Sequence, residues 1–210
     1  MEFPKTLIKR NGYIERIKPF MRKNIAKVLT GQRRVGKSFL LYQLMDQLLV
    51  EEPDANIIYI NFEDFAFSHI QTAEDMHAYI MSKFRKEKYN YIFVDEIQEI
   101  VNFERVIRSL LLNENNDIYI TGSNAKMLSG ELATYLSGRY IEFSVYSLSY
   151  LEFLAFHKLE NNNESLYLYS RYGGLPYLIN LPLKDETVNE YLKSVYSTIV
   201  FRDVVSRYNL

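Results

Sequence analysis

The residues with the clearest chemical signature lie between Gly31 and Ser38. They spell Gly-Gln-Arg-Arg-Val-Gly-Lys-Ser, the G-x-x-x-x-G-K-S spacing of a phosphate-binding loop, between a strand-like run at 27–30 and a helix-like run from Phe39. Glycines at both ends let the backbone turn with positive φ, so that several N–H groups converge on one anion. The pattern therefore predicts a polyphosphate site formed by Gly31, Gln32, Arg33, Arg34, Val35, Gly36, Lys37, Ser38 and Phe39.

Two residues of this loop have predicted roles of their own. Lys37 would contact the β- and γ-phosphates, and the Ser38 hydroxyl would ligate a Mg²⁺ ion that bridges the same oxygens. We expect Lys37 to face solvent when no nucleotide is bound, so that its replacement removes a phosphate contact and little of the core.

A second chemical signature is the acidic pair Asp95-Glu96, which ends the apolar run 91–94. An unpaired carboxylate does not belong inside a sheet, so the pair is expected at a strand end. Beside Ser38, Asp95 could hold the Mg²⁺ through water, and Glu96 could face an attacking water as general base. An apolar strand that ends in two acids is common, but its place after a phosphate-binding loop and one intervening strand unit strengthens the interpretation.

The elements that must position these residues alternate along the chain. Strand-like runs at 27–30, 56–62, 91–94, 117–121 and 140–145 alternate with helix-like runs at 39–50, 73–84, 103–111 and 128–136, which predicts a parallel α/β sheet. Thr72, with Asp75, and Asn102 are expected to cap helices. Ser123 and Asn124 follow the fourth strand, where they could orient the attacking water or sense the γ-phosphate; an ordinary helix cap is an equal alternative.

The pattern changes after Ser147, where helix-like segments surround the interruption at 173–176. We expect three parts: a lead-in segment at 1–20, a phosphate-binding core at 21–146 and a smaller helical lid at 147–210. The long amphipathic helix expected from Asp185 has no stop signal, which suggests a truncated parent chain.

Composition excludes some classes of protein. The chain has 210 residues and no cysteine, so neither disulfides nor thiolate zinc sites are available. No apolar run reaches the length of a membrane span, and the N-terminus lacks a signal-peptide pattern, so a soluble cytoplasmic protein is expected. The segment 1–27 carries eight Lys or Arg against two Glu. This excess could contact nucleic acid, although a solvated helix face is the favoured interpretation.

Taken together, these segments resemble those of AAA+ ATPases, and closely those of a prokaryotic group related to the STAND and origin-recognition branches. Beyond the loop, the similar blocks are 94–98, 120–124, 136–139, 172–176 and 201–203. The resemblance implies the sheet order 5-1-4-3-2 and places Ser123 and Asn124 at the sensor 1 position. It makes Arg139 a candidate arginine finger, acting in cis or in trans, and Pro176 part of a G-x-P element that packs near adenine.

The same resemblance implies ATP or ADP and Mg²⁺ as ligands, and nucleotide-dependent self-association. Family members are about twice as long, with a second half that looks like a winged helix and a nuclease-like or uncharacterised domain, so DNA or a protein partner would be engaged there. Two interpretations remain: an ATPase, and a nucleotide-gated switch or binding module with little turnover. A third interpretation, a P-loop kinase, is weaker, because no acceptor-substrate motif is present and because Glu96 is better suited to activating water.

Overall fold

The computed structural model describes residue 4 and residues 7–123, 135–136 and 138–199. The chain divides into two compact units, one formed by Met1–Gly31 with Lys37–Val145 and the other by Gln32–Gly36 with Tyr146–Leu210. Each unit is described by itself.

The first unit is built on a parallel sheet of five strands in the order β2-β3-β4-β1-β5. The order predicted from the family resemblance is therefore confirmed. Its register aligns Asn61 with Asp95 and Gly31 with Ser123, so the ends of these strands share one edge. The strands are β1 (Ala26–Gly31), β2 (Asn56–Asn61), β3 (Asn90–Asp95), β4 (Asn116–Ser123) and β5 (Tyr140–Ser144).

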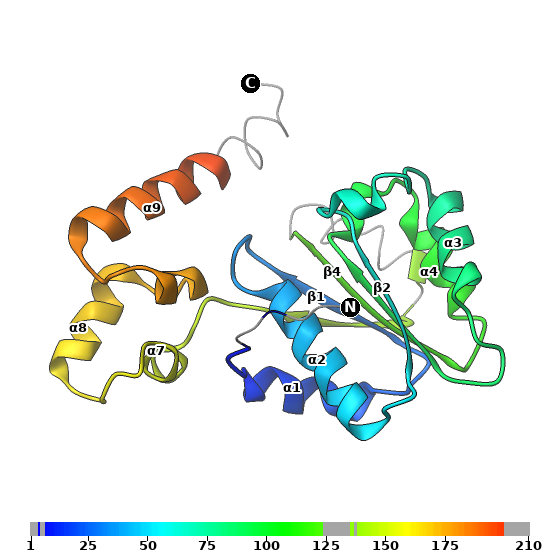
Figure 1. The fold of residues 1–210 in the computed structure, drawn as a ribbon, viewed down its shortest axis with the longest axis horizontal. Helices are drawn as coiled ribbons and strands as arrows, with labels where there is room; N and C mark the ends of the chain where they lie inside the picture. The colour runs from blue at the N-terminus through cyan, green and yellow to red at the C-terminus, as the bar shows by residue number, and fades with distance from the viewer. Residues whose placement is uncertain (1–3, 5–6, 124–134, 137, 200–210) are drawn as a thin grey trace. The chain divides into compact units, whose positions relative to one another are not determined.

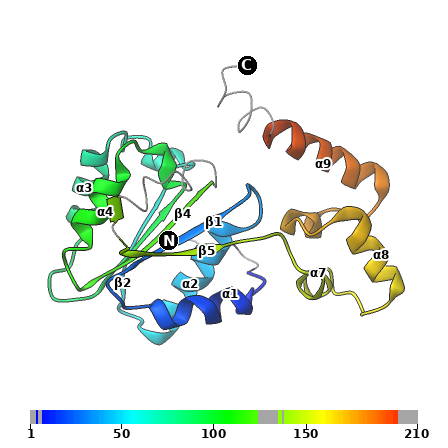
Figure 2. The same cartoon turned by 180° about the vertical axis from the view of Figure 1, so that it is seen from behind.

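Helices cover both faces of this sheet. The sheet runs between α1 and α2 on one side and α3 and α4 on the other, as two opposite views show (Figures 1 and 2). The α-helices are α1 (Asn11–Ile17), α2 (Lys37–Glu51), α3 (Ala73–Ser82) and α4 (Phe103–Leu110). Short 3₁₀ turns are η1 (Lys18–Phe20), η2 (Phe65–Phe67) and η3 (Ile97–Glu99).

The strand sequences explain this two-sided packing, because side chains alternate between the faces of a strand. Val28, Ile92 and Ile120 pack with α3 and α4 in one cluster of buried side chains. The intervening residues, such as Phe93 and Tyr119, are equally buried and stack with ring centroids 4.5 Å apart. Strands that are apolar on both faces are typical of a buried parallel sheet.

Two predicted helix caps had different outcomes. Thr72 forms the expected capping box with Asp75: the Thr72 hydroxyl accepts from the Asp75 N–H at 3.1 Å, and the Asp75 carboxylate accepts from the Thr72 N–H at 3.0 Å. The prediction for Asn102 is wrong. Asn102 precedes α4 in a left-handed conformation (φ 61°) and makes no side-chain cap, because capping requires extended backbone geometry.

The second unit contains the helices that follow the sheet. They are α7 (Tyr150–His157), α8 (Asn163–Tyr172), the 3₁₀ segment η4 (Pro176–Asn180) and α9 (Asp185–Ile199). Tyr172, Leu178 and Val188 form its buried cluster. Gly174 is required here, because a Cβ atom at this position would lie 2.2 Å from the Leu148 carbonyl oxygen. Most of the helix predicted at 128–136, and the end of the chain from 200, lie outside the described residues.

Candidate functional site

The phosphate-binding loop begins where β1 ends, and its glycines have the predicted positive φ values. Gly31 has φ 151°, and a Cβ atom there would lie 2.2 Å from the Val145 carbonyl oxygen. Gly36 has φ 94° and directly precedes α2. Because α2 starts at Lys37, the N–H groups of its first turn and the positive end of its dipole are available to an anion.

Lys37 is not exposed, so the expectation that it faces solvent is wrong. The residue is only 4% exposed, and its Nζ donates to the Gly31 carbonyl oxygen at 3.0 Å. The Lys37 side chain thus reaches from the end of the loop back to its first residue. The Lys37 amino group therefore lies inside the loop, where bound phosphate oxygens could replace the carbonyl as its acceptor.

Asp95 ends β3 and is 1% exposed. Its carboxylate accepts hydrogen bonds from the hydroxyls of Thr121 and Ser38. The Tyr59 hydroxyl lies 3.5 Å from its Oδ2 atom. Burial raises the pKa of Asp95, while the hydroxyls and the charge of Lys37 oppose that rise. A buried carboxylate beside the loop serine is therefore suited to a cation, which would favour its charged form.

Glu96 follows Asp95 with an unusual backbone. Its φ of 53° and ψ of 47° are left-handed, a conformation that costs energy for a residue other than glycine. The Glu96 N–H donates to Thr121 Oγ1 at 3.1 Å, and the Glu96 carboxylate accepts from Gln98 Nε2. The side chain is 8% exposed. The turn directs Glu96 away from the strand path, and two neighbours hold it there.

Residues Gln32–Gly36 of the loop belong to the second unit and have neighbours within it. The Arg34 guanidinium lies 6.0 Å from the ring centroid of Tyr191 in α9. Tyr191 stacks on Tyr177 with ring centroids 5.1 Å apart. A Cβ atom on Gly36 would lie 3.8 Å from Cγ of Pro176, so Pro176 lies close to the second glycine of the loop.

Of the other residues predicted for the site, only some lie at the same edge of the sheet as the phosphate-binding loop. Ser123 is the last residue of β4, at the same edge as Gly31, whereas Asn124 lies outside the described residues. Phe39 is half exposed and packs edge to face on Tyr42. Arg139 lies at the opposite edge: its carbonyl accepts from the Ala26 N–H at 3.0 Å, where β1 begins. Five strand steps separate Ala26 from Gly31, about 17 Å, so Arg139 does not reach the phosphate loop of its own chain.

Sequence reasoning missed three polar side chains that surround the acidic pair: Thr121, Gln98 and Tyr59. Thr121 had a detectable signal, since it is a hydroxyl residue that follows the apolar run 118–120. Gln98 ends the family-like block 94–98, but that block gave it no predicted role. Tyr59 had no signal, because a tyrosine inside a strand is ordinary. Among the described residues, no three His, Asp or Glu side chains are grouped as a metal site, so Mg²⁺ would depend on Ser38, Asp95 and the nucleotide's own oxygens.

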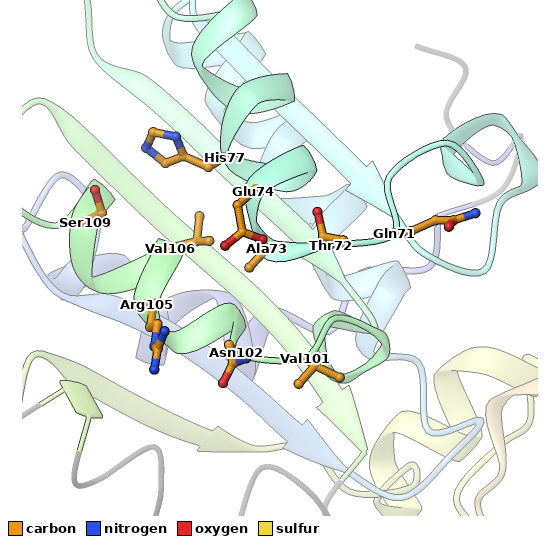
Figure 3. Close-up of a pocket in the computed structure, with 10 residues that line it drawn as sticks. All are labelled: Gln71, Thr72, Ala73, Glu74, His77, Val101, Asn102, Arg105, Val106 and Ser109. Atoms are coloured by element: carbon orange, nitrogen blue, oxygen red, sulfur yellow. The ribbon is translucent and has the colours of Figure 1, made fainter.

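A separate cavity of about 520 Å³ lies between α3 and α4 (Figure 3). Glu74 and His77 line it from α3, and Arg105 and Ser109 from α4. No residue of the phosphate loop or the acidic pair contributes to its lining. The cavity is therefore distinct from the candidate nucleotide site.

The glycine loop, the helix that follows it and the acidic pair on a nearby parallel strand define a P-loop nucleotide-binding domain of the AAA+ type. The chain belongs to a family described as AAA domain, whose model matches residues 23–154. The matched segment contains every element of the sheet and both chemical signatures.

Two similar proteins have no more specific description. The chain is 37% identical over 210 residues to an uncharacterised protein of Haemophilus influenzae, covering 97% of this chain and 52% of that protein. It is 31% identical over 202 residues to an uncharacterised protein of Methanocaldococcus jannaschii, covering 89% of this chain and 43% of that protein. The chain thus spans about half the length of these relatives.

Solved structures with similar folds include replication proteins. AMPPCP-bound DnaA from Aquifex aeolicus superposes with a TM-score of 0.54 at 15% identity, over 83% of this chain and 61% of that one. The Aeropyrum pernix ORC1 protein in complex with DNA gives 0.53 at 12% identity, over 72% and 49%. At these identities the likeness establishes the fold alone. No helix within the described ranges is both long and apolar enough to cross a membrane.

Proposed function

We propose that this domain binds ATP with Mg²⁺ and hydrolyses it to ADP and phosphate. The observation that carries the proposal is the buried pair Asp95-Glu96 at the end of β3, in which Asp95 accepts a hydrogen bond from Ser38 and lies near the charge of Lys37. The two carboxylates have different surroundings: the Asp95 carboxylate accepts from hydroxyl groups, whereas the Glu96 carboxylate accepts from the side-chain amide of Gln98. Different environments suit the two carboxylates to different roles.

Each residue of the site has one role in this proposal. Loop N–H groups and Lys37 bind the phosphates, Ser38 and Asp95 hold the Mg²⁺ ion, and Glu96 accepts a proton from the attacking water. Pro176 packs near the base, and Ser123 and Asn124 orient the water or contact the γ-phosphate. Bound Mg²⁺ neutralises charge that develops on the transferring phosphoryl group.

The position of Arg139 limits how it can contribute. Since it lies at the edge of the sheet away from its own loop, a finger role requires the site of a second copy, and hence assembly. Arg139 is exposed, as such a role demands. We therefore assign it to action in trans, with nucleotide-dependent self-association as the condition.

The test is the substitution Glu96→Gln, which keeps the size of the side chain but removes its basic carboxylate. Single-turnover hydrolysis should fall by about 10²- to 10⁴-fold, while ATP affinity measured by calorimetry stays the same or rises. Glu99→Gln is the matched control, because Glu99 is an exposed acid on the same 3₁₀ turn. It should hydrolyse ATP like the parent protein.

The competing function is a nucleotide-gated switch with little turnover. In that case Glu96 is a structural carboxylate, and Glu96→Gln and parent proteins would hydrolyse ATP at the same slow rate. Equal rates, both above a control without protein, would exclude Glu96 from the mechanism and favour the switch.

The process that nucleotide binding controls would depend on a partner molecule. ORC1, which shares the fold and whose structure contains DNA, suggests DNA, and the basic segment 1–27 is the candidate contact. Several of its charges are engaged within the fold, however. Arg10 and Lys27 are buried, and Arg22 pairs with Glu52 at 3.2 Å. Lys9, Arg16, Lys18 and Lys23 remain exposed and are the candidate contacts of this segment. The parts of the longer relatives that this chain does not span are the other candidate place for a partner, DNA or protein.

A further inference from the structure

We propose that Gln98 is the positioning residue for the general base of the proposed ATPase. The inference rests on the proposed function, since it concerns how Glu96 is held for the chemical step. The observation behind it is the hydrogen bond from the Gln98 side-chain amide to the Glu96 carboxylate, a contact between two buried side chains.

The backbone of Glu96 fixes the direction in which its side chain leaves the chain, but it does not fix the position of the carboxylate. The left-handed conformation of Glu96 and its N–H bond to Thr121 Oγ1 fix the Cα–Cβ vector. Three side-chain torsions still separate Cβ from the carboxylate oxygens, and rotation about them would move the base by several ångströms. A base must lie within hydrogen-bond reach of the water it activates. A second contact is therefore needed at the carboxylate itself.

Gln98 provides that second contact from a fixed place. It is the central residue of η3 and is 5% exposed, so its own side chain is confined by packing. The preceding residue, Ile97, is completely buried and anchors the turn in the core. The Gln98 amide donates a hydrogen bond to Glu96 Oε2, and this contact also fixes the direction in which Oε1 points. One oxygen holds the base in place, and the other can accept the proton.

The chemistry of an amide suits this task. A glutamine side chain is neutral at every physiological pH, so it donates a hydrogen bond without forming an ion pair with the base. A lysine or arginine at this position would hold the carboxylate more strongly and reduce its basicity. A neutral donor can therefore position the Glu96 carboxylate without adding a counter-charge beside it.

The experiment compares Gln98→Met with the parent chain. Methionine has nearly the same shape and no donor, so the turn should keep its packing. We expect single-turnover hydrolysis to fall by 10- to 100-fold, because hydrogen bonds to charged groups contribute about this factor, while the ATP dissociation constant and the KM change less than about threefold. Gln47→Met is the matched control: Gln47 donates to Glu51 at 2.9 Å on an exposed part of α2, and its loss should leave turnover unchanged.

A double-mutant cycle separates positioning from general loss of structure. In the Glu96→Gln background the base is already absent, so Gln98→Met should cause no further loss if Gln98 acts through Glu96. Equal losses in both backgrounds, or parent-like turnover by Gln98→Met, would overturn the role of Gln98 while leaving the ATPase intact. A parent chain that binds ATP but never exceeds the turnover of Lys37→Met would refute the proposed ATPase function and with it the role of Gln98.

Discussion

The two ends of the central sheet each bury a lysine and an aspartate, but they arrange them differently. At the amino end, Lys27 and Asp117 are completely buried and form a direct ion pair. At the carboxyl end, hydroxyl groups and the nearby charge of Lys37 surround Asp95, and Lys37 donates to a backbone carbonyl. At the amino end, the lysine and the aspartate neutralise each other in a direct ion pair. At the carboxyl end, bound phosphate and Mg²⁺ could provide charged partners for the lysine and the aspartate.

The amino-end network is extensive. Asp117 also accepts from the Arg22 N–H at 2.7 Å and from the Tyr119 hydroxyl at 2.8 Å. The Lys27 ammonium donates further to the Ile25 carbonyl at 2.8 Å and lies 4.9 Å from the centre of the Tyr119 ring. Burial lowers the pKa of Lys27, and the charge of Asp117 opposes that change. The network joins the segment before β1 to the interior of the sheet, which is a structural role.

The largest expected effect comes from breaking this pair. Lys27→Met leaves Asp117 as a buried charge without its cation, which typically costs 3–5 kcal/mol. Denaturant unfolding should detect this loss of stability, and the remaining folded protein should bind ATP with parent-like affinity at low temperature. A variant of parent-like stability would show that the pair contributes little, and weakened ATP binding would show that the two ends are coupled.

This pair also shows why part of the structure could not be predicted from the sequence. The strand at 27–30 was evident from its apolar residues, but the burial of Lys27 depends on a partner 90 residues away, brought close by the register of β1 with β4. The burial of Lys37 was also not predicted: its ammonium donates to the carbonyl of Gly31, six residues earlier in the loop, and not to solvent. The glycine positions and the Thr72 cap are local or motif-based and were predictable, and the strand order was predictable from the family resemblance.

Substitution at the other lysine should have an effect of a different kind. Lys37→Met keeps the buried stem but removes the ammonium, so ATP affinity should fall by roughly 100-fold, the scale of one or two hydrogen bonds between charged groups. Unfolding free energy should change by about 1 kcal/mol, the scale of one hydrogen bond such as that to the Gly31 carbonyl. Calorimetry with ATP and denaturant unfolding test the two statements separately. Parent-like affinity would exclude Lys37 from the phosphate site.

The smallest expected effect has the opposite sign and concerns Asp95. Because burial raises its pKa in the folded state, its charged form disfavours folding at neutral pH. Asp95→Asn removes the charge but keeps the shape, and should raise the unfolding free energy of the nucleotide-free protein by roughly 0.5–2 kcal/mol, as is common when a functional residue is neutralised. For a domain of this size that corresponds to a few degrees in Tm.

The pH dependence of this gain follows from the direction of the shift. An acid whose folded pKa is raised contributes stability that is complete below its unfolded pKa and is lost as pH rises through the folded pKa. The advantage of Asp95→Asn should therefore be full near neutral pH and vanish below about pH 4, where Asp95 is protonated in both states. Thermal unfolding from pH 3 to pH 8 measures this pH dependence.

Asp117→Asn is the contrasting variant: it removes the counter-charge of buried Lys27 and should destabilise the chain at neutral pH. Destabilisation by both substitutions would mean that Asp95, like Asp117, serves the fold, and Mg²⁺-dependent stabilisation by ATP that survives in Asp95→Asn would remove Asp95 from the metal site.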